Sequence, residues 1–308
     1  MSELVSYVMK SEQLIEGYRQ AGFRCISVGR TTWLLDERHV ALALPTLVDI
    51  YPSRQDIQQL FAHKVRVASF PTCCDSIESN TVEYVLMPGD YDISNVLPRE
   101  RRQTRRGLEW CKVRIATVDE ILGRGLEINR HVLGRQKRST NYLCDARRWE
   151  TYAKTFLAMP DVMPFVSCVD GAIAAYLMVF LVNQTLILMH PFVDLQYKKK
   201  YPFNALLFTA ITQARQKFGP LEVSYGFESV WRMKSLDHFK EGMGFQGKRR
   251  LRISLFSGWY KHILWPSMVM LLNAVPVVSD RIGSRYGALV REKSDGLNWW
   301  RHQGVIVE

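Results

Sequence analysis

Three strand-like segments follow one another in the second half of the chain with no helix between them. Residues 164–168 and 172–182 flank the turn Val169-Asp-Gly171, which is typical of a β-hairpin, and residues 184–189 form the third segment. A doubly wound parallel sheet needs a crossover helix between successive strands, so this run excludes that architecture. The sequence therefore predicts an α+β fold with a mixed sheet flanked by helices.

Helices and strands alternate in the rest of the chain. Apolar residues recur at helical spacing over 203–218, and Gly219-Pro220 ends that pattern. Ser53 is a predicted cap of a helix that begins at Arg54. Further helices are predicted over 12–21, 54–63 and 98–107, after residue 116 to about 133, and over 147–157 and 235–243. Further strands are predicted over 24–28, 32–35, 40–44, 65–69, 82–86, 112–116, 221–225 and 248–256.

Length and composition indicate a folded, intracellular protein. A chain of 308 residues with 47% hydrophobic and 23% charged residues predicts one large or two modest domains rather than disorder. The six cysteines form no CxxC pair, and the adjacent Cys73 and Cys74 have a poor geometry for a disulfide. The N-terminus shows no signal peptide, so we expect a cytoplasmic location.

The charge of the chain predicts an anionic partner. The net charge is +11, and residues 97–140 hold 12 Lys and Arg against 5 Asp and Glu. Such a surface suits tRNA, a phosphorylated or nucleotide-linked substrate, or an acidic membrane. A solvated helical face is the alternative interpretation of the same cluster.

A late apolar segment, residues 263–278, is too short to span a bilayer and contains two prolines. We expect it to pack on the protein body as a helix. Because Trp259, Tyr260 and Trp265 flank or begin it, a peripheral contact with the inner face of a membrane is the alternative.

The stretch Ser235–Phe245, with the sequence SLDHFKEGMGF, is a short amphipathic helix followed by glycine, an aromatic residue and a basic strand. It resembles the ending of the Fem-type branch of the GNAT acyltransferase fold, in which a short helix carries a Phe-Lys pair before the last strand. The resemblance covers residues 97–256. It implies two tandem GNAT-like halves: a degenerate half at 1–96, a transferase domain at 97–256 and a C-terminal helical tail at 257–308.

Lys240 is the residue that the resemblance places at the reaction centre. A fixed cation there would stabilise a developing oxyanion or the ribose leaving group of aminoacyl-tRNA. Helical spacing puts Leu236, Phe239 and Met243 on one apolar face, with Lys240 beside it near the helix end. A lysine favoured by the helix dipole is the alternative.

The turn before the long helix, residues 190–204, is the predicted contact for the donor. A helix N-terminus attracts anions, and Pro202 suits the first helical turn. GNAT proteins that use acetyl-CoA have glycines in this turn, whereas this chain has bulky residues, which disfavours the close backbone approach that CoA needs. Charge and contact would come from Lys198, Lys200 and Tyr201; a solvated lysine run is the alternative.

Two further groups complete the predicted site. Tyr225 and Glu228 end a strand at Tyr225-Gly-Phe-Glu228, where the resemblance places the cleft, and Glu228 could accept a proton from an attacking amine or be an ordinary loop residue. Arg102 and Arg106 lie on the basic helix 98–107, where close cations would repel one another unless phosphates bind.

These features predict an acyltransferase that moves an aminoacyl or acyl group from an activated donor to an amine by direct attack. The donor is expected to be aminoacyl-tRNA, with acyl-CoA or acyl-carrier protein as the alternative. The acceptor would be an amine-bearing small molecule or cell-envelope precursor. No resident cofactor and no metal site are expected, because no nucleotide-binding or metal-binding motif occurs. A non-catalytic GNAT-like module is the remaining alternative.

Overall fold

The structure is a computed structural model that describes residues 10–74, 77–136, 141–228 and 234–257. The predicted tail from residue 258 onward, including the apolar segment 263–278, lies outside the described residues. The chain forms two compact units. The first comprises Met1–Gly22, Tyr84–Gly226 and Ser235–Gly247, and the second comprises Phe23–Glu83, Phe227–Lys234 and Lys248–Glu308.

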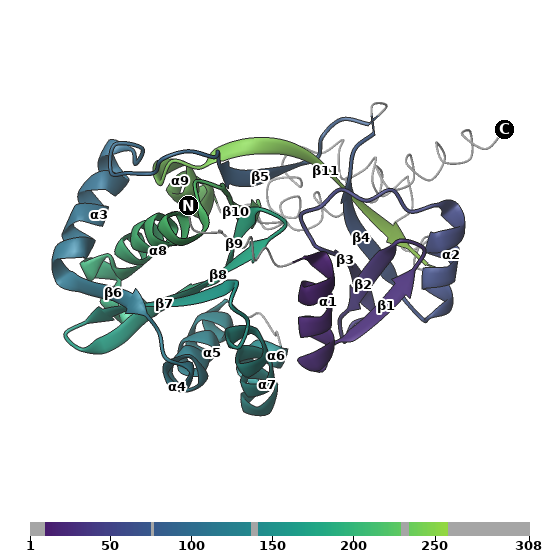
Figure 1. The fold of residues 1–308 in the computed structure, drawn as a ribbon, viewed down its shortest axis with the longest axis horizontal. Helices are drawn as coiled ribbons and strands as arrows, with labels where there is room; N and C mark the ends of the chain where they lie inside the picture. Colours follow the sequence, from purple (N-terminus) through teal and green to yellow (C-terminus); the bar gives the residue numbers. More distant parts are fainter. Residues whose placement is uncertain (1–9, 75–76, 137–140, 229–233, 258–308) are drawn as a thin grey trace, which may run out of the picture. The chain divides into compact units, whose positions relative to one another are not determined.

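The first unit is built on a mixed sheet (Figure 1). Its strand order is β5-β10-β9-β8-β7-β6. Strands β6 to β9 pair antiparallel, whereas β10 runs parallel to β9. The strands are β5 (Thr81–Leu86), β6 (Cys111–Ile115), β7 (Val162–Val169), β8 (Ala172–Val182), β9 (Thr185–Val193) and β10 (Glu222–Phe227).

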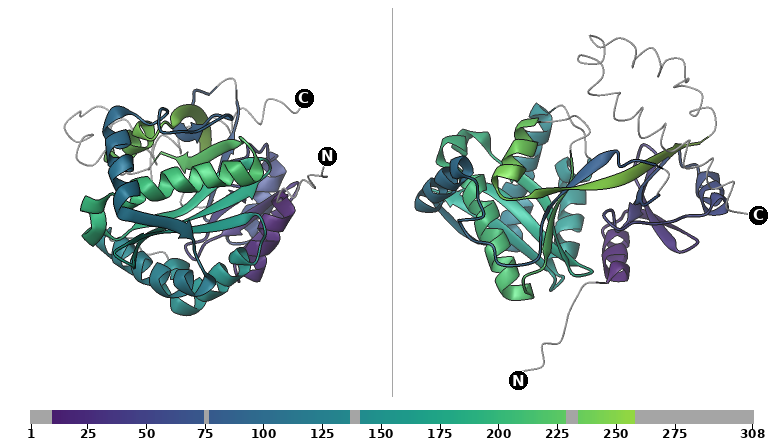
Figure 2. Two further views of the ribbon diagram at one scale, coloured as in Figure 1. Left: turned by 60° about the vertical axis from the view of Figure 1, so that its left-hand side comes forward. Right: turned by 90° about the horizontal axis from the view of Figure 1, so that it is seen from above.

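Helices cover both faces of this sheet (Figures 1 and 2). Helix α8 (Pro202–Phe218) lies on one face with α3 (Pro98–Trp110) packed against it, and short helices lie on the other. Because both faces are covered, β8 is buried at nine consecutive positions, a continuous apolar run instead of an alternating one. The remaining helices are α1 (Ser11–Gln20), α4 (Val118–Glu120), the π-helix η1 (Ile121–Gly125), α5 (Leu126–Arg135), α6 (Asn141–Cys144), α7 (Ala146–Leu157), the 3₁₀-helix η2 (Leu195–Lys200) and α9 (Lys234–Gly242).

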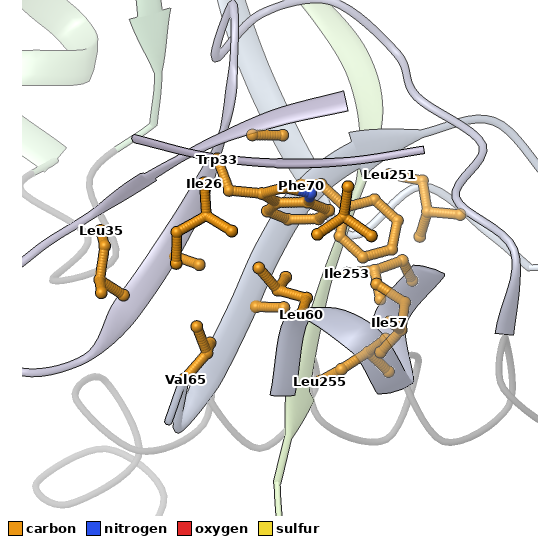
Figure 3. Packing of buried hydrophobic residues seen from close by; sticks show 14 residues of the cluster. Ile26, Trp33, Leu35, Ile57, Leu60, Val65, Phe70, Leu251, Ile253 and Leu255 are labelled. Atoms are coloured by element: carbon orange, nitrogen blue, oxygen red, sulfur yellow. The ribbon is translucent and has the colours of Figure 1, made fainter. Parts of the chain in front are cut away.

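In its described residues, the second unit has strand order β1-β2-β3-β4-β11, with helix α2 (Arg54–Ala62) packed against the strands. Helix α2 points Ile57 and Leu60 at the strands, where Trp33 and Phe70 meet edge to face with ring centroids 5.7 Å apart (Figure 3). This cluster is the unit's apolar core. The strands are β1 (Arg24–Val28), β2 (Thr31–Leu35), β3 (Val40–Leu44), β4 (Val67–Thr72) and β11 (Gln246–Phe256).

The two units repeat one supersecondary pattern. In each, three antiparallel strands lead into a helix and then a strand parallel to the third: β1-β2-β3-α2-β4 in one and β7-β8-β9-α8-β10 in the other. The next strand of each copy is exchanged. Strand β5 follows β4 in sequence but lies beside β10, and β11 follows β10 but pairs antiparallel with β4. The predicted pair of GNAT-like halves is confirmed, and the division of the chain at residue 97 stays a prediction.

Several element boundaries differ from the predicted ones by a few residues, and two of the differences bear on the site. Helix α3 continues three residues beyond Gly107, because that glycine is a packing position and not a helix stop. A Cβ atom there would lie 2.6 Å from the Tyr201 carbonyl oxygen. Strand β9 extends to Val193, so His190 lies within the strand and not in the turn before α8.

Candidate active site

Lys240 is buried, with 2% of its side chain exposed. Sequence periodicity placed it beside the apolar face of α9, whereas the structure places it inside the first unit. Lysine is almost never buried without compensation, because taking an ammonium group out of water costs several kcal/mol. The alternative interpretation, a solvated lysine that the helix dipole favours at the C-terminus of α9, therefore does not explain the burial of Lys240.

Two aromatic rings and one carboxylate compensate the Lys240 ammonium group. Its Nζ lies 4.5 Å from the ring centroid of Tyr84 and 5.0 Å from that of Tyr225, so both rings can make cation–π contacts. Asp237 Oδ1 lies 3.9 Å from Nζ, and within the described chain this buried oxygen has no hydrogen-bond donor. Burial raises the pKa of Asp237, and Lys240 opposes that shift.

The hydroxyl group of Tyr225 stays protonated at neutral pH. Burial raises its pKa well above the ordinary value. The phenol can therefore donate a hydrogen bond but cannot serve as a general base. Its ring also packs edge to face on Phe245, with centroids 5.5 Å apart, which fixes the aromatic surface under Lys240. The predicted pair Lys240 and Tyr225 is thus brought together.

The glycines of the SLDHFKEGMGF segment hold α9 in place. A Cβ atom on Gly242 would lie 2.6 Å from the Glu100 side chain, and the Leu97 N–H donates to the Gly242 carbonyl at 2.8 Å. Gly244 has φ +93°, a conformation that favours glycine, and lets the Phe245 N–H donate to the Lys240 carbonyl at 3.1 Å. These contacts therefore fix the last turn of α9, which carries Lys240.

Strands β9 and β10 part beside this cation. Their parallel pairing covers Glu222, Val223 and Ser224 of β10, and its last partners are Ser224 and Ile187. Tyr225 is the next residue of β10, followed by Gly226 at φ +82°. The pairing with β9 thus ends one residue before Tyr225, whose ring contacts Lys240.

The predicted donor turn becomes the 3₁₀-helix η2, capped by Asp194, which accepts from the Gln196 N–H at 3.2 Å. Tyr201 follows with φ +53°, an uncommon backbone conformation for a residue with a side chain. Its ring stacks on Trp110, with centroids 6.3 Å apart and planes 14° apart. Lys200 Nζ lies 4.7 Å from the Trp110 ring centroid, so Lys200 and Tyr201 meet on one aromatic residue.

The predicted arginines on α3 are exposed. Arg102 and Arg106 point to solvent, whereas their neighbour Arg101 donates to the carbonyl oxygens of Val96 and Ser94 at 2.9 Å each. Lys198 is also exposed. A role for these cations in substrate binding stays a prediction.

Glu228 belongs to the second unit, and its N–H donates at 2.6 Å to the carbonyl of Val82, in the part of β5 that falls in the same unit. Its proposed role as proton acceptor stays a prediction. Sequence reasoning missed Tyr84, Asp237 and Trp110. Only Asp237 carried a local signal, since an acid three residues before Lys240 lies on the same side of a helix.

His190 has a structural environment instead of a catalytic one. Its Nε2 lies 2.9 Å from the Tyr152 hydroxyl, inside a buried aromatic cluster, and burial lowers its pKa to about 4. At neutral pH the imidazole is therefore uncharged. His190 is therefore a residue of the core.

Within the part of the chain that the structure describes, no helix is long and apolar enough to cross a membrane. In the same residues, no cluster of three His, Cys, Asp or Glu side chains could hold a metal ion.

Solved structures share this architecture. No family model and no curated protein matches the chain. FemX resembles it with a TM-score of 0.57 at 11% identity, over 82% of this chain and 93% of FemX. The C-terminal domain of a lysylphosphatidylglycerol synthetase from Agrobacterium fabrum gives 0.53 at 10%, over 80% and 87%. A Bacteroides thetaiotaomicron protein of unknown function gives 0.51 at 9%, over 79% and 88%. At these identities the likeness concerns the fold alone, and the predicted GNAT-like fold, as seen in FemX, is confirmed.

Proposed function

We propose that this protein is an acyltransferase that moves an aminoacyl group from aminoacyl-tRNA onto the amine of a small molecule or cell-envelope precursor. The observation that carries this proposal is the burial of Lys240 between Tyr84 and Tyr225, at the point where β9 and β10 part. A purely structural role would favour an apolar side chain, because a buried cation costs free energy that a leucine or methionine would not. The fold supports the same reaction class.

The chemistry needs no covalent intermediate with the protein. The acceptor nitrogen attacks the ester carbonyl carbon of the donor, and the carbonyl electron pair moves onto its oxygen. The intermediate then expels the ribose oxygen, which takes up the proton that the nitrogen loses. The donor is already activated, so positioning and charge stabilisation supply most of the rate. Lys240 is proposed to face the developing negative charge.

The turn before α8 favours tRNA over CoA as the donor. Lys199, Tyr201 and Phe203 occupy positions where a backbone that wraps a pyrophosphate needs glycine. Tyr201 keeps its left-handed backbone conformation with its ring stacked on Trp110, so its side chain lines this turn. We infer that phosphates are met there by side chains and not by main-chain N–H groups.

An N-acyltransferase that uses acyl-CoA or acyl-carrier protein is the second candidate. The exposed cations of α3 and η2 suit an acidic carrier protein equally well. A cytoplasmic location and peripheral membrane contact stay predictions.

A label-transfer experiment tests the proposal. The wild-type protein is incubated with a mixture of amine acceptors and with one donor at a time: tRNA charged with labelled amino acids, labelled acetyl-CoA, or labelled long-chain acyl-CoA. An aminoacyl ester is hydrolysed by mild base, whereas the amide product survives. We expect base-stable label from charged tRNA only, and loss of that label with Lys240→Ala.

The matched control is Lys154→Ala, which removes an exposed lysine on α7 that pairs with Glu150 at 2.6 Å. This variant should transfer label as the wild type does. Transfer from acyl-CoA alone would establish the second candidate, and full transfer by Lys240→Ala would remove Lys240 from the reaction.

A further inference from the structure

We propose that an exposed surface around Trp110 binds the single-stranded end of an RNA by stacking one base and holding its phosphates. The Trp110 surface consists of Trp110, Tyr201, Lys200, Arg102 and Arg106. This inference rests on the proposed function, because it assigns the single-stranded end of the tRNA donor to a binding surface on the first unit. It adds Trp110, a residue with no counterpart among the sequence-derived candidates.

Trp110 is exposed to solvent, which is unusual for a tryptophan. Trp110 ends α3 with 42% of its surface exposed. Tyr201 stacks almost parallel to it, and Lys200 Nζ lies 4.7 Å from its ring centroid. The neighbouring aromatic ring and cation hold the indole in one orientation. An exposed aromatic ring beside cations is the combination with which proteins stack the bases of single strands.

The cations of this surface lack acidic partners. Within the described residues, Arg102, Arg105 and Arg106 make no ion pair, and neither do Lys198 and Lys199. Glu109, on the same helix, makes none with them either. Helix α3 packs against η2 and, at Gly107, approaches Tyr201, which joins η2 to α8: a Cβ atom there would lie 2.6 Å from the Tyr201 carbonyl oxygen, so the cations of α3 and η2 lie on neighbouring segments. Their mutual repulsion would be relieved by phosphates.

The length of the surface fits a nucleic-acid strand better than a single cofactor. Arg102, Arg106 and Trp110 recur at intervals of four residues and so form one stripe along α3. At the helical rise, this stripe is about 12 Å long. A pyrophosphate would contact one part of it, whereas successive phosphates of an extended strand can follow the whole stripe, with the terminal base on Trp110.

Binding can be measured without any transfer reaction. The probe is a fluorescein-labelled single-stranded RNA of eight nucleotides ending in CCA, titrated with the full-length protein at several salt concentrations and followed by anisotropy. We expect Trp110→Ala to weaken binding about 5- to 100-fold with an unchanged salt dependence, since loss of one stacked base removes no phosphate contact. Trp110→Phe should keep most of the affinity.

The two arginines should affect the salt dependence of binding. Arg102→Ala combined with Arg106→Ala should reduce the slope of log K against log salt by about 1.4, two phosphate contacts at about 0.7 each for a single strand. Tyr51→Ala, an exposed aromatic in the second unit, is the matched control and should bind as the wild type does. Circular dichroism checks the fold of each variant.

Three results would overturn the inference: no binding of the RNA by the wild type, equal affinity of the wild type and Trp110→Ala, or displacement of the RNA by CoA with CoA affinity lost in Trp110→Ala. The last would assign the surface to a nucleotide cofactor. Lys240→Ala should bind the RNA normally, so failure of this inference and failure of the proposed function are separable.

Discussion

Lys240 and Tyr225 show how much of the role of a single residue can be predicted from the sequence. The family resemblance indicated both, Lys240 through the SLDHFKEGMGF segment and Tyr225 through the strand end Tyr225-Gly-Phe-Glu228, but helical spacing alone left Lys240 beside the apolar face. Its burial depends on Tyr84, on a strand far away in sequence, and no local pattern reports that contact. Asp237 was within reach of sequence reasoning, because the i, i+3 spacing to Lys240 is visible. Trp110 was not, since exposure of an aromatic residue is decided by tertiary packing.

At the same scale, His190 predicts a pH dependence of stability. Burial lowers its pKa to about 4, whereas the unfolded chain protonates histidine near pH 6.5. Between these values the unfolded state binds a proton that the folded state does not, so stability falls as pH falls from 6.5 to 4. Over that window the loss is about 3 kcal/mol.

Urea unfolding of the wild type and His190→Gln at pH values from 4 to 7 measures this contribution. The difference in unfolding free energy between the two proteins should shrink as the pH is lowered, because only the wild type carries the histidine penalty. Two parallel pH profiles would show that His190 is protonated equally in both states.

Most helices and strands lie where the sequence predicts them. Where an element ends elsewhere, the cause is a contact with another element. Gly107 looked like a helix end because glycine commonly terminates helices, yet α3 continues to Trp110. The reason is the close approach of α3 to the start of α8. The turn before α8 held a 3₁₀-helix, which lysine-rich sequence does not specify.

Gly107→Ala should therefore destabilise the protein by about 1–3 kcal/mol, as expected for overpacking at a backbone contact. The new Cβ atom would lie 2.6 Å from the Tyr201 carbonyl oxygen and 3.1 Å from the Ala205 Cβ. Thermal unfolding measures the effect.

Gly134→Ala is the matched control for that substitution. Gly134 lies on α5 with nothing within 4 Å of its added Cβ, so this variant should gain up to about 1 kcal/mol from helix propensity. Equal effects of the two substitutions would contradict the packing role of Gly107.

In the whole molecule, two copies of one pattern exchange their last strands. The order of elements followed from periodicity and from the three strands without helices, and the two GNAT-like halves were implied by the family resemblance. The exchange of β5 and β11 did not, because strand pairing between segments far apart in sequence depends on long-range contacts. Glu228 falls in the second unit for the same reason: the chain crosses between units at residue 227.

At this scale too, we propose that the Lys240 cation, buried beside the end of the β9–β10 pairing, stabilises negative charge during acyl transfer. Lys240→Met keeps the length and the apolar stem of the side chain and removes the charge. It should therefore keep the fold and the affinity for the donor.

The decisive measurement is the single-turnover rate of label transfer from charged tRNA by Lys240→Met, with donor affinity determined on the same sample. We expect affinity within about twofold of the wild type and a rate lower by about 10²–10³, the usual effect of removing one group that stabilises an oxyanion. A wild-type rate, or a loss of rate that only follows weaker donor binding, would contradict this account.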